Sequence, residues 1–218
     1  MHSNNEILSM NISSQNLRNV ALLFNNHPRY GIGDRIVEEI FLKYPNNEKL
    51  ENILTKVTML NSIYATAVYD IYGISQHIFR LADIDYLMRS GDQEAVNKIR
   101  CGHGISTKNK KERNFYSFST KYCFFRNNDA YPIFDSIVAE LLLLFNAVYN
   151  FSPGFSRISL HDYGMYKELN KSFQKHFNLT DISCREFDHA MWLIGKYVFR
   201  KASDKDFEWL NVEVKSVL

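Results

Sequence analysis

Apolar residues recur at steps of three and four along most of this chain, which is the spacing of one buried face of an α-helix. The pattern runs clearly from Ser14 to Phe24, and again over the longer stretch from Leu50 to Tyr72. No segment alternates apolar and polar residues for long enough to predict a β-strand, and no internal repeat is visible. We therefore expect an all-α protein, a helical bundle of about nine helices.

Residues that start and stop helices punctuate this pattern. Asp34 is expected to open a helix that ends before Pro45, because aspartate caps helix N-termini and proline follows C-termini. Pro132 suits the first helical position of the next leucine-rich segment. Ser183 and Glu186 have the spacing of a capping box, in which two side chains satisfy free backbone N–H groups. These residues predict where three of the helices begin.

A break at Ser152-Pro-Gly154 interrupts the helical pattern late in the chain. With 218 residues, the chain is long enough to bury a substantial core. We expect a single domain over 1–218, with a central helical lobe at 48–150 and a packing lobe formed by 1–47 together with 151–218.

The composition is that of a globular protein, with 45% hydrophobic residues, 23% charged residues and a net charge of +2. Aromatic residues reach 14%, and such rings either fill a core or stack on nucleobases. Residues 1–10 lack the apolar core of a signal peptide, and the apolar stretch at 137–145 is too short to span a bilayer. Three widely spaced cysteines fit a reducing compartment. We therefore expect a cytoplasmic monomer without membrane contact.

Positive charge is concentrated in residues 98–113, which contain four Lys, two Arg and one Glu. Two glycines and the absence of apolar periodicity predict a loop. Because such cations neutralise phosphates, the segment is a candidate DNA contact, and a solvated surface loop is the alternative. The candidate contacts are Lys98, Arg100, Lys108, Lys110, Lys111 and Arg113.

Common signatures of nucleotide-binding and hydrolytic enzymes are absent, including GxxxxGK[ST], HExxH and GxSxG. The pair Gly31 and Gly33 has no preceding strand and is expected to form a turn. Cys101 and His103 would supply two metal ligands, which are too few for a site. We expect neither a metal nor a cofactor.

Lys121 lies in a segment where aromatic rings recur at helical spacing. If these rings face the core, they desolvate the amine and favour the neutral form that a nucleophile needs. The alternative is a lysine that extends along apolar surface to water. Asp135 follows fourteen residues later, at an expected helix start, where the helix dipole alone would favour a carboxylate. The rings of this segment are Phe115, Phe118, Tyr122 and Phe125.

The segments around these two residues resemble helix-hairpin-helix DNA glycosylases of the 8-oxoguanine type. SFSTKYCFF, which contains Lys121, is followed by YPIFDSIV, which contains Asp135. Together with LNSIYATAV upstream and FDHAMWLIGK downstream, they are similar to bacterial proteins with an oxoguanine-glycosylase-like fold, some of which act in defence against phages. The resemblance covers about residues 57–196. It implies two lobes with a cleft between them, double-stranded DNA as the partner, and flipping of the target base.

The resemblance also implies roles for individual residues. Lys121 would be the nucleophile, and Asp135 would stabilise the positive charge that develops on the sugar. Asn61 matches the position that inserts into the gap left by the flipped nucleotide, and an ordinary helix-surface residue is the alternative. For the base-pocket residues of the C-terminal helix, the alternative is a tryptophan anchored in the core beside surface polar residues. The implied base pocket consists of Asp188, His189, Trp192 and Phe118.

The leading hypothesis is therefore a DNA N-glycosylase that excises a modified or damaged base, with AP-lyase activity left open. On the resemblance, a glycosylated hydroxymethylcytosine of phage DNA is one candidate substrate, in antiviral defence. The alternative is a non-enzymatic helical nucleic-acid-binding or regulatory protein, which explains the basic segment and the rings equally well. A helical scaffold that binds no DNA is the third hypothesis.

Overall fold

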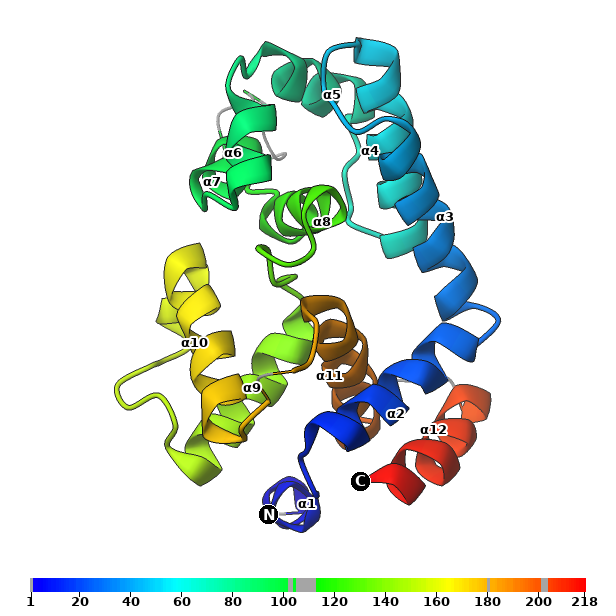
Figure 1. Cartoon of the computed structure of the whole chain (residues 1–218), viewed down its shortest axis with the longest axis vertical. Coiled ribbons are helices and arrows are strands. Elements are labelled where there is room, and N and C mark those ends of the chain that lie inside the picture. The colour runs from blue at the N-terminus through cyan, green and yellow to red at the C-terminus, as the bar shows by residue number, and fades with distance from the viewer. Residues whose placement is uncertain (1, 102–103, 105–112, 180, 201–203) are drawn as a thin grey trace. The chain divides into compact units, whose positions relative to one another are not determined.

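The computed structural model describes residues 2–101, 104, 113–179, 181–200 and 204–218 (Figure 1). In these residues all regular structure is helical, with twelve α-helices, one short 3-10 helix and no strand. The expected all-α class is confirmed. Within the same residues, no helix combines the length and the apolar character that crossing a membrane requires.

The helices outnumber the roughly nine expected from periodicity, because long apolar stretches are interrupted. The stretch from Leu50 to Tyr72 shows how this happens. It contains α4 (Leu50–Tyr64) and only the first residues of α5 (Ile71–Arg80). The side chain of Asp70 accepts a hydrogen bond from the N–H of Gly73 and so caps a new helix where the apolar pattern simply continues.

The chain forms two compact units. Unit 1 combines Met1–Gly31 with Phe134–Leu218, and unit 2 is the continuous segment Ile32–Ile133. These boundaries differ from the expected ones at residues 47 and 150. The reason is packing: Phe41 lies against Tyr122 within unit 2, whereas the helix that begins after residue 135 packs within unit 1.

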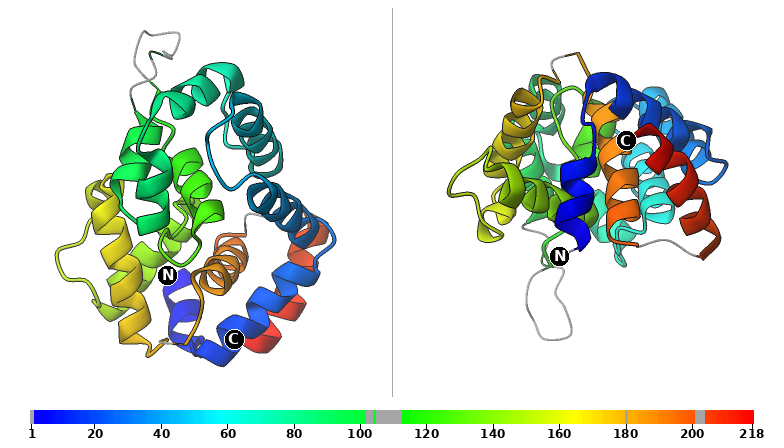
Figure 2. Two further views of the ribbon diagram at one scale, coloured as in Figure 1. Left: turned by 45° about the horizontal axis from the view of Figure 1, so that its top comes forward. Right: turned by 90° about the horizontal axis from the view of Figure 1, so that it is seen from below.

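Unit 1 is organised around one helix, α11, which packs against α2, α9 and α12 (Figure 1). The views of Figure 2 show α10 beside α9. Buried side chains such as Leu17 of α2 and Leu193 of α11 form the core between these helices. The helices of unit 1 are α1 (His2–Ser9), α2 (Ser14–Asn26), α9 (Ser136–Tyr149), η1 (Ile158–His161), α10 (Tyr163–His176), α11 (Cys184–Val198) and α12 (Asp204–Val217).

Two helix starts in unit 1 were expected from the sequence. The capping box of α11 is confirmed, because the Ser183 side chain accepts from the N–H of Glu186 and the Glu186 carboxylate accepts from the N–H of Ser183. The prediction for Pro132 is wrong, since α9 begins at Ser136. Its N-cap is Asp135, whose carboxylate accepts from the N–H of Ile137 at 2.8 Å, so the side-chain cap rather than the proline sets the start.

Unit 2 is built around α8, which packs against α4, α6 and α7 (Figure 2). Every residue from Phe118 to Phe125 is buried, so the helix is enclosed on all sides rather than on one face. Two polar residues fit there because their hydroxyls bond to the helix itself: Ser119 donates to the carbonyl of Tyr116, and Thr120 donates to the carbonyl of Ser117. The helices with most of their length in unit 2 are α3 (Tyr30–Lys43), α4, α5, α6 (Ile84–Ser90), α7 (Glu94–Arg100) and α8 (Tyr116–Arg126).

The start of α3 differs from both expectations for this region. The helix begins at Tyr30, so Gly31 and Gly33 are helical and do not form a turn, and Asp34 lies inside the helix instead of opening it. The Nδ1 atom of His27 lies 3.4 Å from the backbone nitrogen of Tyr30 and accepts its hydrogen bond. An imidazole therefore takes the capping role that the sequence assigned to aspartate.

Candidate functional site

Lys121, the expected nucleophile, is buried in unit 2. Its side chain is only 4% exposed, although it belongs to a charged residue type that is rarely enclosed. Its Nζ donates to Oγ of Ser117 at 2.7 Å, one helical turn earlier. The same Nζ lies 5.8 Å from the centre of the Tyr64 ring, within the range of a cation–π contact. This burial differs from the alternative in which the lysine extends to bulk water.

A carboxylate that the sequence did not single out for chemistry lies beside the same tyrosine. Asp34 is 3% exposed, and its Oδ1 accepts a hydrogen bond from the Tyr64 hydroxyl at 2.5 Å. Tyr64 therefore contacts an amine through its ring and a carboxylate through its hydroxyl. We call Asp34, Tyr64, Ser117 and Lys121 the Lys121 cluster, and all four residues belong to unit 2.

No local pattern could have identified the Lys121 cluster from the sequence. Asp34 and Tyr64 are thirty residues apart, on α3 and α4, while Lys121 is on α8. The aspartate also occupies a position that resembles a helix start, and that assignment explained it without any tertiary contact.

Asp135, the expected partner of Lys121, belongs to unit 1, whereas Lys121 belongs to unit 2. The structure thus does not place the two residues in one compact unit. Within unit 1 the Asp135 carboxylate caps α9, which is the structural alternative that the helix dipole already suggested.

Unit 2 contains a second buried lysine, which the sequence did not single out. Lys56 is 1% exposed, and its Nζ donates to Oδ1 of Asn47 at 2.7 Å and to the carbonyl of Asn46 at 3.2 Å. The rings of Phe41 and Tyr122 lie 5.4 and 5.3 Å from this ammonium group. The amine is therefore enclosed by two oxygen acceptors and two aromatic faces.

Asn47 links this lysine to two further polar groups. Its backbone N–H and its side-chain amide donate to the two carboxylate oxygens of Asp85, at 2.8 and 2.7 Å. Its Oδ1 also accepts from the Tyr122 hydroxyl at 2.5 Å. Burial lowers the pKa of Lys56 to about 8, with a partial offset from Asp85 and a smaller lowering by Arg126. We call Lys56, Asn47, Asp85 and Tyr122 the Lys56 cluster. Because each of these polar groups finds a hydrogen-bond partner among the others, the cluster joins α4, α8 and the loop at residues 46–47.

The residues expected to form a base pocket are divided between the units. Phe118 lies in the core of unit 2, with its ring centre 5.7 Å from that of Tyr122. Asp188, His189 and Trp192 lie on α11 of unit 1, where Asp188 is half-buried. The structure thus does not bring these four residues together within one unit.

His189 and Trp192 belong to an aromatic cluster of unit 1. The His189 ring is buried and stacks on Phe24 with a centre-to-centre distance of 3.9 Å. Trp192 meets the edges of Phe24 and Tyr30, and the Nζ of Lys196 lies 4.6 Å from its ring centre. These contacts differ from the alternative of a core tryptophan beside surface polar residues, because the imidazole of His189 is buried and Trp192 is only partly buried.

The Asn61 side chain, expected to enter DNA, is used inside the protein. Its Oδ1 accepts from the Thr66 hydroxyl at 2.9 Å and from the N–H of Val68 at 3.0 Å. Its Nδ2 donates to the carbonyl of Val68 at 3.1 Å. Both ends of the carboxamide therefore shape the turn that follows α4, so Asn61 is not an ordinary helix-surface residue.

The cations of residues 98–113 are described in part. Lys98 and Arg100 lie in the last turn of α7, and Lys98 forms a 2.6 Å ion pair with Asp83. Arg100 lies over the ring of Tyr116, and Arg113 lies over the ring of Tyr69. The remaining candidates, Lys108, Lys110 and Lys111, lie outside the described residues.

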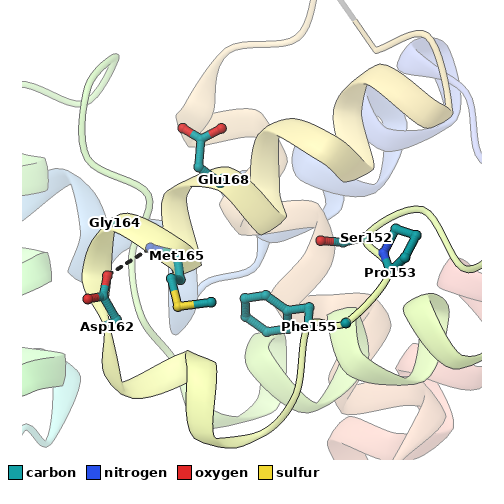
Figure 3. A pocket seen from close by; sticks show the side chains of 8 residues that line it. Ser152, Pro153, Phe155, Asp162, Gly164, Met165 and Glu168 are labelled. Carbon is teal, nitrogen blue, oxygen red and sulfur yellow. Dashed lines mark hydrogen bonds between the residues drawn. The ribbon is translucent and has the colours of Figure 1, made fainter.

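Unit 1 also contains an open pocket of about 500 Å³ between the loop at 152–155 and the start of α10 (Figure 3). Phe155 and Met165 face each other across it. Asp162 stands at the helix start, where its Oδ1 accepts from the N–H of Met165 at 2.9 Å and caps α10. Among the described residues, no group of three or more His, Cys, Asp or Glu side chains could hold a metal ion.

This all-α protein, with two buried lysine clusters in its central segment, can be placed in a family by comparison with known proteins. Residues 16–130, which include nearly all of unit 2, match the model of the HI_0787_N family, described as an N-terminal domain. The chain belongs to this family. It is also 39% identical over 155 residues to a protein of Haemophilus influenzae named only "Uncharacterized protein", covering 71% of this chain and 72% of that relative. No solved structure matches the chain.

Proposed function

We propose that this protein is a DNA glycosylase with Lys121 as its nucleophile, in a two-lobed helix-hairpin-helix fold of the oxoguanine-glycosylase type. The observation that carries the proposal is the enclosure of the Lys121 amine by Ser117 and the Tyr64 ring. Removal from water favours the neutral amine, which is the reactive form. The hydroxyl and the ring orient that amine.

The proposed reaction transfers the sugar from the base to the lysine. The electron pair of the neutral Nζ attacks C1′ of the deoxyribose, while the bond between C1′ and the base nitrogen breaks. The base leaves with that bonding pair and takes up a proton. Opening of the sugar ring then forms an imine between Nζ and C1′, with O4′ taking the proton that the amine loses. Hydrolysis of the imine leaves an abasic site, and elimination of the 3′-phosphate from the imine is the AP-lyase route.

Two carboxylates are candidates for stabilising the positive charge on the sugar. The resemblance assigns this role to Asp135, whereas the Lys121 cluster nominates Asp34, which Tyr64 links to the amine. Asparagine at either position removes the charge and keeps the size. Because asparagine caps helices as well as aspartate does, Asp135→Asn leaves the start of α9 intact. The variant that loses base release identifies the carboxylate that acts.

The proposal is tested with a panel of duplexes that carry 8-oxoguanine, 5-hydroxymethylcytosine or glucosylated 5-hydroxymethylcytosine, the last representing phage DNA. Released bases are measured by mass spectrometry, and the imine is reduced with borohydride to a stable protein–DNA adduct. Wild-type protein should release one of these bases and form the adduct. Lys121→Gln should lose both, while Lys43→Gln, which removes an exposed lysine of α3, should retain both.

Two results would contradict this assignment. A borohydride adduct that persists in Lys121→Gln would place the nucleophile elsewhere. DNA binding without release of any base in the panel would favour the alternative of a non-enzymatic nucleic-acid-binding or regulatory protein. Circular dichroism of each variant shows whether a lost activity reflects lost folding.

A further inference from the structure

The turn after α4 contains backbone strain that its surroundings maintain. Ala65 and Ala67 have φ values of 48° and 57°, in the left-handed region that alanine rarely adopts. The Asn61 carboxamide holds the turn from within. Arg113, more than forty residues later, donates from Nη1 to the carbonyl of Ala67 at 3.1 Å. Such strain persists only where neighbouring contacts impose it, and it often marks a functional segment.

The residue that this turn presents is Tyr69. Its side chain is 78% exposed, which is unusual for a large aromatic residue in an ordered part of a protein. The guanidinium carbon of Arg113 lies 4.6 Å from the centre of its ring. The same arginine therefore fixes the turn through Ala67 and restrains the ring through a cation–π contact, while most of Tyr69 remains in solvent.

A second arginine–tyrosine pair in this protein shows that a cation–π contact does not by itself leave the tyrosine ring exposed. The guanidinium carbon of Arg100 lies 4.1 Å from the centre of the Tyr116 ring, and Tyr116 is 7% exposed. That pair packs a ring into the core of unit 2. The Arg113 pair instead holds the Tyr69 ring outside the core, so packing of the core does not explain why this ring is fixed in place.

The charge of Arg113 beside Tyr69 limits which kinds of partner could cover the exposed face of this ring. Arg113 is the last residue of a segment in which the sequence has six cations and one anion. An apolar protein partner would have to desolvate the guanidinium group, which is costly. A nucleotide offers a π-face to the ring and a phosphate to the cation, so it satisfies both groups together.

We propose that Tyr69 and Arg113 form a stacking site for an unpaired nucleobase of DNA. The site rests on the proposed function only in taking DNA as the ligand. Tyr69 supplies the ring on which the base stacks, Arg113 supplies charge for the adjoining phosphate, and Asn61 positions Tyr69 through the turn.

The test uses the full chain and two DNA duplexes that contain 2-aminopurine, whose fluorescence falls when it stacks. In one duplex the 2-aminopurine faces a tetrahydrofuran abasic analogue and is unpaired, and in the other it is paired with thymine. Wild-type protein should quench the unpaired probe and bind that duplex about tenfold more tightly than the paired one, as expected for one stacked base. Tyr69→Ala should lose the quenching and the preference, and Tyr69→Phe should retain both.

Tyr86 provides the matched control, because it is an exposed tyrosine of the same unit at 67% exposure. Tyr86→Ala should behave as the wild type. The proposal is overturned if Tyr69→Ala quenches and prefers the unpaired duplex as the wild type does, if both tyrosine variants lose these effects equally, or if the wild type shows neither.

The readout separates this site from the glycosylase proposal, because it requires stacking and not base release. Quenching that depends on Tyr69, in a protein that releases no base from the earlier panel, supports the stacking site while the proposed enzymatic function fails. Base release that depends on Lys121, with quenching unaffected by Tyr69→Ala, contradicts the stacking site alone.

Discussion

Lys121 and Lys56 are both enclosed in unit 2, and their neighbours suit them to different tasks. Lys56 donates to two oxygen acceptors contributed by residues 46 and 47 and joins three segments of the unit. Lys121 lies with a serine hydroxyl and a tyrosine whose own hydroxyl bonds to a buried aspartate. Desolvation acts on any buried amine, so burial by itself does not distinguish a nucleophile from a structural lysine. The proposed role of Lys121 therefore rests on its particular contacts with Ser117 and Tyr64.

The lowered pKa of Lys56 predicts a stability that rises with pH. Lysine has an ordinary pKa of 10.5, and burial reduces it to about 8 in the folded protein. Between these values the unfolded chain binds more protons than the folded one, so raising the pH favours folding. From pH 7.5 to 9.5 this group should add about 2 kcal/mol to the free energy of unfolding.

Urea unfolding of wild type and Lys56→Met at the two pH values measures this contribution. The difference between the proteins isolates Lys56 from other titrating groups, and the gain should be missing in the variant. An identical pH dependence in both proteins would show that Lys56 keeps an ordinary pKa in the folded state.

At the scale of the element, short side-chain contacts at helix ends and close backbone approaches determine where helices start and how they cross. The capping box of α11 and the Asp135 cap of α9 are local, whereas the approach at Gly31 joins two helices. Local caps can be found from spacing in the sequence. Close approaches between backbones cannot be found in this way, because the sequence does not show which backbone segment will lie next to the glycine.

The cap of α9 predicts a difference between two substitutions of Asp135. Alanine removes the acceptor for the N–H of Ile137 and should lower the free energy of unfolding by about 1 kcal/mol. Asparagine retains an acceptor and should change stability by only a few tenths of that amount. Chemical denaturation of both variants tests the pair, and equal losses would mean that the carboxylate charge, not the cap, stabilises the helix start.

The close approach at Gly31 predicts a larger effect. A Cβ there would lie 2.0 Å from the carbonyl oxygen of Asn25, which is backbone and cannot move without shifting α2. Gly31→Ala should therefore cost more than about 2 kcal/mol, despite the better helix propensity of alanine. Gly33→Ala is the control in the same helix, because its Cβ would lie 2.9 Å from Cγ2 of Ile63, a side-chain methyl at an exposed position and not backbone.

Thermal unfolding of the two variants gives the comparison. Gly31→Ala should melt well below Gly33→Ala, because only the first substitution forces two backbones apart. A near-native melting temperature for Gly31→Ala would mean that the junction of α2 and α3 is more adaptable than its geometry indicates.

At the scale of the whole molecule, charge is distributed unevenly. The net charge is only +2, yet residues 98–113 hold six cations and one anion. A nearly neutral protein with one basic segment is expected to contact DNA through few phosphates. Of these six cations, Lys98 contacts Asp83, and Arg100 and Arg113 lie over Tyr116 and Tyr69, whereas Lys108, Lys110 and Lys111 lie outside the described residues.

Replacing those three lysines with glutamine should weaken DNA binding in a salt-dependent manner. The slope of log affinity against log salt should become shallower by roughly 2 to 3, because each phosphate contact contributes about 0.9 to it. Fluorescence anisotropy with a labelled duplex over a salt series measures both slopes. Lys43, Lys171 and Lys175, three exposed lysines elsewhere, provide the control triple. If both triples reduce the slope equally, only net charge matters and the segment has no special role.

Much of the fold could be predicted because its signals are local. Helical periodicity determined the all-α class, and the spacing of Ser183 and Glu186 identified the capping box of α11. The errors at Asp34 and Pro132 have one cause: each residue type favours a helix start, but neighbouring side chains provided the cap that the fold uses. Residue preferences indicate several positions at which a helix could start, and the hydrogen bonds available in the folded chain determine which one is used.

The sequence by itself determined helices, charge and the presence of a lysine among aromatic rings. Tertiary structure alone decided that Lys121 shares Tyr64 with Asp34, that Asn47 joins Lys56 to Asp85, and that Asn61 and Arg113 hold the turn before Tyr69. The physical reason is the distance along the chain over which each kind of interaction acts. Backbone periodicity and caps act within one or two helical turns, whereas the burial of a polar group is tolerated only where distant segments supply its partners.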